Sequence, residues 1–297
     1  MVLRTNILYL RAAIIQSIRS YFISRDFLEV ETPLRIPANA PEEHIEPIMS
    51  DDQYLQTSPE LCMKRLLCRG YGKIFQISRC WRNNERGRNH VPEFTMLEWY
   101  RADSDYRDIM NDCEDLLAWV SEKSIVADLP LKTSLTGKIQ LITVQNAFAQ
   151  FASKDMHAAV SDGSFDELMV TMVEPGLANI SPVILFDYPA RMASLARIKD
   201  EDQLIAERFE LYAGGLELAN GFSELNDPDE QRSRFEMSNS HRMAKGYPPL
   251  PLPEPFLKEL SSMPRSAGIA LGVDRLVMLC TGATMIDDVL AFTPEDL

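Results

Sequence analysis

A pair of adjacent glycines between two strand-like segments constrains the fold of this chain more than any other feature. Residues 207–213 and 216–222 flank Gly214 and Gly215. Two glycines at this spacing are typical of a two-residue β-hairpin turn, which needs positive φ angles that most residues avoid. Such a turn joins antiparallel strands, because parallel strands need a long crossover connection. The sequence therefore predicts an antiparallel β-sheet at the centre of the fold.

Helical and strand-like patterns accompany this hairpin. Apolar residues recur at steps of four from Leu10 to Phe22, which predicts a helix over residues 6–22. The other expected elements are strands over 27–32, 74–81, 94–100 and 267–273, helices over 108–120 and from 275 onward, an extended loop over 247–255, and a mostly helical insertion over 125–185. We expect an α+β fold, an antiparallel sheet flanked by helices, in a single domain spanning residues 1–297.

The composition excludes several classes of protein. Hydrophobic residues make up 45% and charged residues 25%, the balance of a globular chain. No apolar run approaches the ~18 residues of a membrane span, so we expect no membrane partner. The five cysteines form no C-x-x-C pair, and their odd number fits a reduced, cytoplasmic protein.

The charge distribution argues against extended contact with nucleic acid. A net charge of -14 repels a phosphate backbone. Residues 64–107 nevertheless carry ten Lys or Arg against five Asp or Glu. This local basic excess fits either a small anionic ligand or a solvated basic face.

The register of the hairpin brings two glutamates together. With Gly214 and Gly215 as the turn, Tyr212 lies opposite Glu217, and Glu210 shares their face. Two neighbouring carboxylates repel each other unless a cation lies between them, and Mg²⁺ prefers oxygen ligands and substrate phosphates. The pattern predicts a magnesium site at Glu210 and Glu217, the alternative being two exposed glutamates on a solvent face.

Three later residues of the hairpin fall on the opposite face under strict alternation. They are Asn220, Phe222 and Glu224. They can join the two glutamates only if a β-bulge adds one residue to the strand. Gly221 is the expected position of that bulge.

Two further segments offer charges for an anionic ligand. In the polar loop before residue 94, Arg82 offers a planar fork for phosphate or carboxylate, and Phe94 a ring on which a base can stack. In the expected strand–helix junction, Gly272 would allow close approach of a ligand and Arg275 would supply a positive charge. A solvated loop and a surface charge are the alternatives. The chain has no G-x-x-x-x-G-K phosphate loop, so nucleotide binding would be of another kind.

In order and spacing, these segments resemble motifs 1, 2 and 3 of the class II aminoacyl-tRNA synthetases. The lysyl-tRNA synthetase branch is the more similar one. Three blocks carry this resemblance: Thr57–Leu61, His90–Tyr100 and Gly215–Asn226. The resemblance covers nearly the whole chain and implies the class II catalytic fold.

Two differences from lysyl-tRNA synthetases favour a stand-alone paralogue. Motif 1 starts within the first ten residues, so we expect no anticodon-binding domain and no binding of a tRNA anticodon. Ala270 stands where lysyl-tRNA synthetases have glycine. The chain is thus similar to the elongation factor P lysine ligase family, which attaches (R)-β-lysine to a lysine side chain of elongation factor P. The alternatives are a truncated enzyme that activates α-lysine for another acceptor and a non-catalytic synthetase-like regulator.

The resemblance implies a role for each motif residue, with ATP as co-substrate, Mg²⁺ as cofactor and a homodimer built on motif 1. Arg82 and Arg275 would be catalytic. The ATP site would comprise Arg82, Asn83, Asn84, His90, Phe94, Glu217, Leu218, Gly272 and Arg275. The site for lysine or (R)-β-lysine would comprise Ser58, Pro59, Glu60, Glu98, Tyr100, Asn220, Phe222, Glu224 and Ala270. Glu210 and Glu217 would bind the metal.

Motif 2 departs from the family pattern at two positions. Position 84 is Asn where the family has Glu, and position 91 is Val where relatives have Asn. Asn84 keeps an acceptor oxygen for the adenine amine but lacks the charge, which Glu85 could supply instead. At Val91 only a backbone contact could remain.

Overall fold

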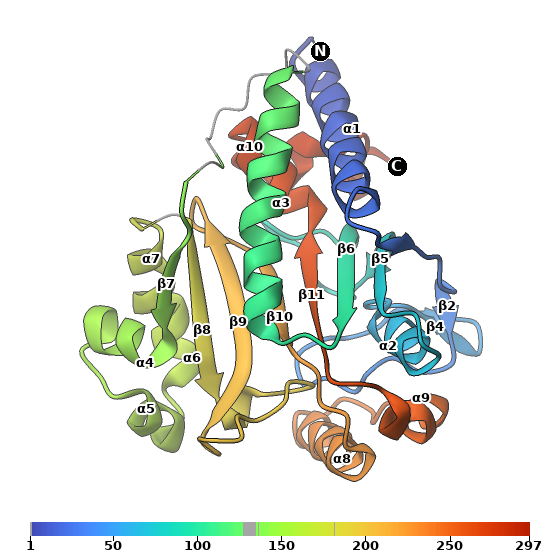
Figure 1. Ribbon diagram of the computed structural model, residues 1–297, viewed down its shortest axis with the longest axis vertical. Helices are drawn as coiled ribbons and strands as arrows, with labels where there is room; N and C mark the ends of the chain where they lie inside the picture. The colour runs from blue at the N-terminus through green and yellow to red at the C-terminus, as the bar shows by residue number, and fades with distance from the viewer. Residues whose placement is uncertain (1, 127–134, 136, 181) are drawn as a thin grey trace.

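The computed structural model, which describes residues 2–126, 135, 137–180 and 182–297, is built on one eight-stranded sheet (Figure 1). The strand order is β1-β5-β6-β11-β10-β9-β8-β7. Its strands are β1 (Leu28–Glu29), β5 (Lys73–Trp81), β6 (Glu93–Ala102), β7 (Gln140–Thr143), β8 (Val183–Pro189), β9 (Ile205–Ala213), β10 (Leu216–Ser223) and β11 (Ser266–Gly272). A small second sheet contains β2 (Arg35–Ile36), β4 (Gln53–Leu55) and β3 (Met49–Ser50).

The predicted antiparallel arrangement is confirmed for the six strands from β5 to β8 in this order and is wrong at the two edges. There, β1 pairs with β5 and β7 with β8 in parallel. Both edge pairs are joined by long segments, one of which contains α4 to α7. Connections of that length permit parallel pairing, which a hairpin turn does not.

Two long helices, α1 (Val2–Ile23) and α3 (Tyr106–Val126), cover one face of the sheet (Figure 1). A third helix, α10 (Val273–Thr281), follows β11 at the upper end of the sheet and contacts α1. The predicted helix over 6–22 is confirmed. Its residues Ile14, Ile18 and Phe22 are fully buried in the hydrophobic core against the sheet. The Phe22 ring stacks on Phe75 with centroids 4.7 Å apart. The predicted strand over 27–32 shrinks to β1, because only Leu28 and Glu29 find register partners at the sheet edge.

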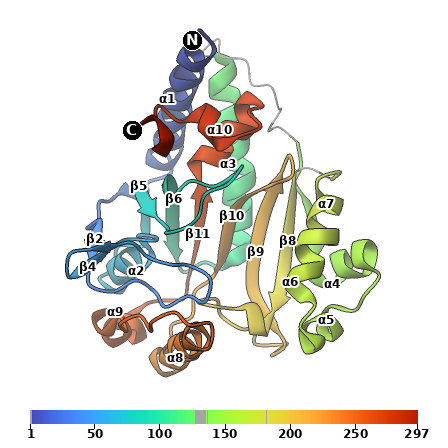
Figure 2. The same cartoon turned by 180° about the vertical axis from the view of Figure 1, so that it is seen from behind.

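The other helices lie beyond the ends and the far edge of the sheet (Figure 2). They are α2 (Glu60–Cys68), α4 (Val144–Ala147), α5 (Met156–Asp162), α6 (Phe165–Leu168), α7 (Glu174–Leu177), α8 (Pro228–Ala244) and α9 (Glu254–Glu259). Two π-helical turns cover Phe148–Ala152 and Met169–Val173, and 3-10 turns cover Ala190–Met192, Leu260–Ser262, Ile286–Val289 and Pro294–Asp296. No helix in the described part of the chain is long and apolar enough to span a bilayer.

The segment 125–185, which we expect to be mostly helical, forms a small subassembly at the β8 edge. Its described part contains α4 to α7 and the strand β7, with β8 starting at its end. The rings of Phe148 and Phe165 stack at its centre, 4.7 Å apart. Residues 127–134, 136 and 181 lie outside the described residues.

Alternation along β6 separates the two faces of the sheet. Leu97 and Trp99 point into the core under α1 and α3. Met96, Glu98 and Tyr100 point to the other face, where they line a cavity. The helices therefore protect one face, and the other face is available for a site.

The hairpin register is confirmed at the turn, but the predicted bulge position is wrong. Ala213 pairs with Leu216 and Tyr212 with Glu217. The register then shifts between Glu217 and Ala219, so the extra residue is Leu218 and not Gly221. Glycine is needed at position 221 for a different reason, because a Cβ there would lie 2.7 Å from the Phe209 ring.

We predict that Gly221→Ala destabilises the fold by about 1–3 kcal/mol, because the added methyl overpacks a filled core against Phe209 and Ile269. Urea unfolding measures this loss. Gly87→Ala is the matched control, since no atom lies within 4 Å of its added Cβ. Equal stability of the two variants would contradict the packing role of Gly221.

Candidate active site

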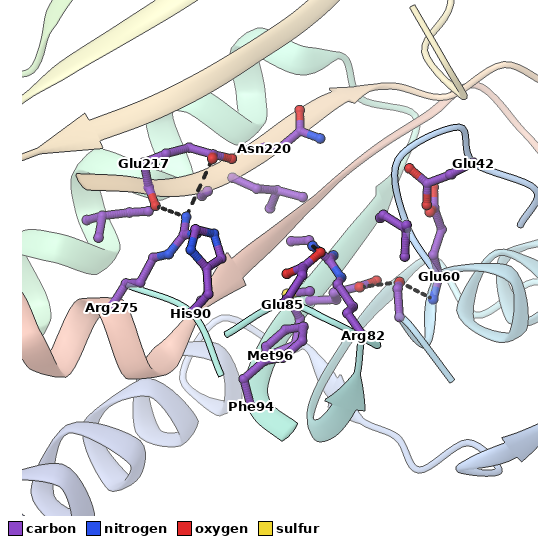
Figure 3. Close-up of a pocket in the computed structure, with 18 of the residues that line it drawn as sticks. Glu42, Glu60, Arg82, Glu85, His90, Phe94, Met96, Glu217, Asn220 and Arg275 are labelled. Carbon is purple, nitrogen blue, oxygen red and sulfur yellow. Dashed lines mark hydrogen bonds and ion pairs between the residues drawn. The ribbon is translucent and has the colours of Figure 1, made fainter. Parts of the chain in front are cut away.

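A cavity of about 360 Å³ lies on the open face of the sheet, against β6, β10 and β11 (Figure 3). Arg275 and His90 lie side by side at one end, and Glu42 and Glu60 lie at the other. Arg82 and Glu85 occupy the space between them. The cavity therefore has a cationic end, a central guanidinium and a carboxylate-rich end.

The cationic end depends on the bulge in β10. Arg275, at the start of α10, donates from Nη1 to the backbone oxygen of Glu217 at 2.7 Å. Its Nη2 lies 2.6 Å from Nε2 of His90. Burial and the charge of Arg275 lower the pKa of His90, so the neutral ring accepts this hydrogen bond. The Arg275 guanidinium is thus fixed in direction at the cavity wall.

Arg82 presents its guanidinium to the cavity with few internal partners. It directly follows β5, and its backbone nitrogen donates to the oxygen of Pro92 at 2.9 Å, which closes the motif 2 loop. Its Cζ lies 5.1 Å from the centroid of the Phe94 ring. Among the described residues, Nε has no hydrogen-bond partner, and the Glu85 carboxylate is 3.9 Å away. Such a guanidinium is suited to an anionic group of a ligand.

At the carboxylate-rich end, Glu98 is held by two hydroxyl groups. Ser58 donates to Oε1 at 2.5 Å, and Tyr100 donates to Oε2 at 2.7 Å. The side chain is fully buried, and burial together with nearby Glu60 raises its pKa to about 7. Glu98 is therefore oriented by its neighbours to meet a cationic ligand group.

A buried ion triad supports this end from behind. Nζ of Lys64, on α2, lies 2.6 Å from Oε1 of Glu60 and 2.5 Å from Oε2 of Glu224. Lys64 and Glu224 are almost completely buried. Burial raises the pKa of Glu224 to about 8, although Lys64 opposes the shift. The triad ties α2 to the end of β10.

The two expected metal ligands differ in accessibility. Glu217 lines the cavity. Glu210 is buried and accepts hydrogen bonds from Tyr188, Tyr212 and Arg208. Three hydrogen bonds leave one of the roughly four lone-pair positions of its carboxylate. In the described part of the chain, no cluster of three or more His, Cys, Asp or Glu side chains forms a metal site on its own.

Fourteen of the predicted site residues line the cavity together. They are Ser58, Glu60, Arg82, His90, Phe94, Glu98, Tyr100, Glu217, Leu218, Asn220, Phe222, Ala270, Gly272 and Arg275. The other five lie outside its wall: Pro59, Asn83, Asn84, Glu210 and Glu224. Asn84 is exposed with a φ of 63°, whereas its neighbour Glu85 lines the cavity. That Glu85 takes the role of position 84 stays a prediction.

Sequence reasoning missed Glu42, Lys64 and Arg208 as parts of the site. Arg208 is two residues before Glu210 on β9, so the alternation of the strand could have placed it on the same face. Lys64 is four residues after Glu60 on α2, a spacing typical of helical ion pairs. Glu42 lies in a loop with no motif, and no sequence signal indicated it.

Comparison with known proteins agrees with this geometry. The tRNA synthetases class II (D, K and N) family matches residues 3–296 of the chain. The chain belongs to this family. It is also 42% identical to the elongation factor P--(R)-beta-lysine ligase of Salmonella gallinarum, over 96% of this chain and 94% of that protein. The ligase of the same name from Erwinia tasmaniensis is likewise 42% identical, with the same coverage.

Family membership confirms the class II fold implied by the three motifs. Arg82 and Arg275, the two arginines that the sequence motifs single out, both line the cavity of this structure. The long-range arrangement of β6, β10 and β11 brings the motifs together. The residues that the motifs singled out are therefore neighbours in space.

We predict that Lys64→Met lowers the free energy of unfolding by about 3–5 kcal/mol, since it leaves the buried Glu224 and the partly exposed Glu60 without their counter-ion. Thermal and urea unfolding measure the loss. Arg65→Met is the control, because the partly exposed pair of Arg65 with Glu259 at 2.6 Å is worth less than about 1 kcal/mol. A loss no larger than that of the control would show that the triad does not stabilise the fold.

We predict that Glu98→Gln gains stability relative to the parent protein as the pH rises from about 5 to about 8. The folded pKa of Glu98 is raised to about 7, so folding favours its protonated form and the parent loses this contribution through that range. Glutamine has no charge to bury. Unfolding curves at several pH values test this; a pH-independent difference between the two proteins would contradict it.

Proposed function

We propose that this protein activates (R)-β-lysine with ATP and transfers it to a lysine side chain of elongation factor P. The supporting observation is the two-ended cavity: groups suited to a nucleotide lie at one end and carboxylates suited to an amine at the other, with Arg82 between them. The names and the extensive coverage of the relatives point to the same reaction.

The ATP end would work by positioning and electrostatics. Phe94 would stack on adenine, and Arg275 and His90 would contact phosphates. Arg82 would bind the amino-acid carboxylate and the α-phosphate, so that one oxygen attacks in line. Its charge would stabilise the transition state, and no protein nucleophile is needed.

A magnesium ion would bind at Glu217 and Glu210, together with the ATP phosphates. Glu217 faces the cavity, and Glu210 keeps one lone-pair position after its contacts with tyrosines and Arg208. When bound, the ion would neutralise the charge of the departing pyrophosphate. The residues present therefore fit a metal that is completed by substrate oxygens.

The amino-acid end would bind two ammonium groups. Ser58 and Glu60 would meet the amine nearest the carboxylate. Glu98, oriented by Tyr100, would meet the far ammonium, with Glu224 and its Lys64 partner behind the wall. Asn220 and Phe222 would complete the pocket. Ala270 lies between Glu98 and Asn220 in neighbouring strands, so its methyl group limits where the amine can lie.

The two alternatives make different demands on this site. A truncated synthetase would use α-lysine, which the Ala270 methyl disfavours. A non-catalytic regulator was suggested by Asn84, but the carboxylate of Glu85 lines the cavity next to Arg82. The active ligase is therefore the better reading of the site.

We also propose a cytoplasmic homodimer. Large apolar side chains are exposed along α1 and the segment that follows it, where motif 1 would form the interface. They are Leu8, Tyr9, Ile23, Leu28 and Leu34. Burial of this surface against a second copy would remove it from water.

The decisive test is amino-acid-dependent ATP–pyrophosphate exchange with α-lysine and (R)-β-lysine in parallel. We expect a preference for (R)-β-lysine. We expect Ala270→Gly to reduce that preference by about 1–3 kcal/mol, because a single methyl in a pocket discriminates by this amount. A preference of the parent protein for α-lysine would contradict the proposal, and the absence of exchange with either isomer would favour the regulator.

A further inference from the structure

Glu42 is a cavity carboxylate to which the motifs assign no role. It lies in the loop between β2 and β3 and lines the same cavity as Arg82 and Glu60 (Figure 3). Among the described residues, no side chain or backbone group donates a hydrogen bond to its carboxylate, and none forms an ion pair with it. Glu98 and Glu224, by contrast, both have close partners. Glu42 is therefore available to a group that enters the cavity.

The loop that carries Glu42 is held from outside the sheet by one buried arginine. Nη1 of Arg242, on α8, donates to the backbone oxygens of Glu42 at 3.2 Å and Ile45 at 3.0 Å. Its Nη2 forms an ion pair with Glu46 at 2.6 Å. Asn83 adds a backbone hydrogen bond to the oxygen of Glu46 at 2.7 Å. These contacts fix the position of Glu42 at the cavity wall without engaging its carboxylate.

The surroundings of Glu42 suit a group that takes up a proton. The charged groups that face it are Glu60 from α2, Arg82 and Glu85 from the motif 2 loop, and Arg208 from β9. Burial and the negative charge of Glu60 raise its pKa to about 7, against the opposing effect of the two arginines. A base with a pKa near the working pH is the most effective one.

The transfer step of the proposed function needs such a group. The acceptor is a lysine amine with an ordinary pKa near ~10.4, so at neutral pH it arrives as an ammonium ion without a lone pair. A hydroxyl acceptor does not have this difficulty. The ammonium must lose a proton before its nitrogen can attack the activated carbonyl group.

We propose that Glu42 is a catalytic residue of the transfer step, which binds the ammonium group of the acceptor lysine and removes its proton. This inference rests on the proposed function. Arg82 and Glu42 line one cavity and interact electrostatically, so an acyl group held at Arg82 is within the same space as the acceptor amine.

The step balances as follows in atoms and charge. The ammonium gives one proton to the Glu42 carboxylate. The free amine then forms the C–N bond with the acyl carbon, and the bond from that carbon to the phosphate oxygen of AMP breaks. The second proton leaves the nitrogen with the departing AMP phosphate. The products are the amide, AMP and protonated Glu42, which returns its proton to solvent.

The test compares Glu42→Gln with the parent protein in two separate reactions. The first is (R)-β-lysine-dependent ATP–pyrophosphate exchange, and the second is single-turnover transfer from the preformed adenylate to elongation factor P, followed by the mass gain of the acceptor. We expect exchange to change less than about threefold and transfer to fall about 10²–10⁴-fold, the usual contribution of a general base. Glu43→Gln is the control, since the neighbouring Glu43 binds Lys245 at 2.8 Å on the outer side of the loop.

A second acceptor separates proton removal from a structural role. Hydroxylamine is already neutral at pH 7, so Glu42→Gln should consume the adenylate with hydroxylamine at the parental rate. For transfer to elongation factor P, the parental rate should level off above pH ~7, whereas the rate of Glu42→Gln should keep rising as more of the acceptor amine becomes neutral.

Three results would overturn the inference. The first is unchanged transfer by Glu42→Gln. The second is an equal loss of exchange and transfer, which would assign Glu42 to amino-acid binding. The third is a loss of the reaction with hydroxylamine as large as the loss of transfer to elongation factor P. The failure of the proposed function itself would look different, because the parent protein would then show no exchange or no transfer to elongation factor P.

Discussion

One extra residue in β10 determines the chemistry of the whole cavity. Because side chains alternate along a strand, an unbulged β10 would direct Glu217 and Asn220 to opposite faces of the sheet. The bulge at Leu218 puts Glu217, Asn220 and Phe222 on one face, and the next residue of that series, Glu224, reaches Lys64. The same bulge accompanies the contact of the Glu217 backbone oxygen with Arg275. A single strand can therefore supply several of the groups that line the cavity.

Most of the fold can be predicted from the local spacing of apolar residues and glycines. The hairpin turn, the antiparallel centre of the sheet and the helix that ends near Phe22 follow from residue spacing and from two glycines. All three are confirmed. Glycine is common at bulges, which favours Gly221 as the bulge in the sequence, whereas in the structure this glycine leaves room for the Phe209 ring. The short β1 and the parallel edges depend on partners far along the chain. In the site, the roles of Lys64 and Glu42 depend on neighbours that are distant in the sequence. No local sequence pattern contains these neighbours.

Three carboxylates of the cavity and one directly behind its wall have raised pKa values. They are Glu42, Glu98 and Glu217, with Glu224 behind the wall, and the chief cause in each is burial away from water. Each of them disfavours the folded state as it ionises. In the proposed function, an amino acid with two ammonium groups would bring positive charge to the carboxylate-rich end and relieve part of this repulsion. Perturbed carboxylates are therefore expected to gather where a dicationic amino acid binds.

The two proposed steps, activation and transfer, use residues from different parts of the fold. In the proposed function, activation needs fixed charges around ATP, and these come from Glu217 on β10 and Arg275 at the start of α10. In the proposed transfer step, the proton acceptor is Glu42, which is carried by a loop and not by the sheet. The loop of Glu42 is fastened to α8 through Arg242 and to the motif 2 loop through Asn83. The residues proposed for activation and the residue proposed for transfer therefore come from different parts of the fold, the sheet with α10 and this loop.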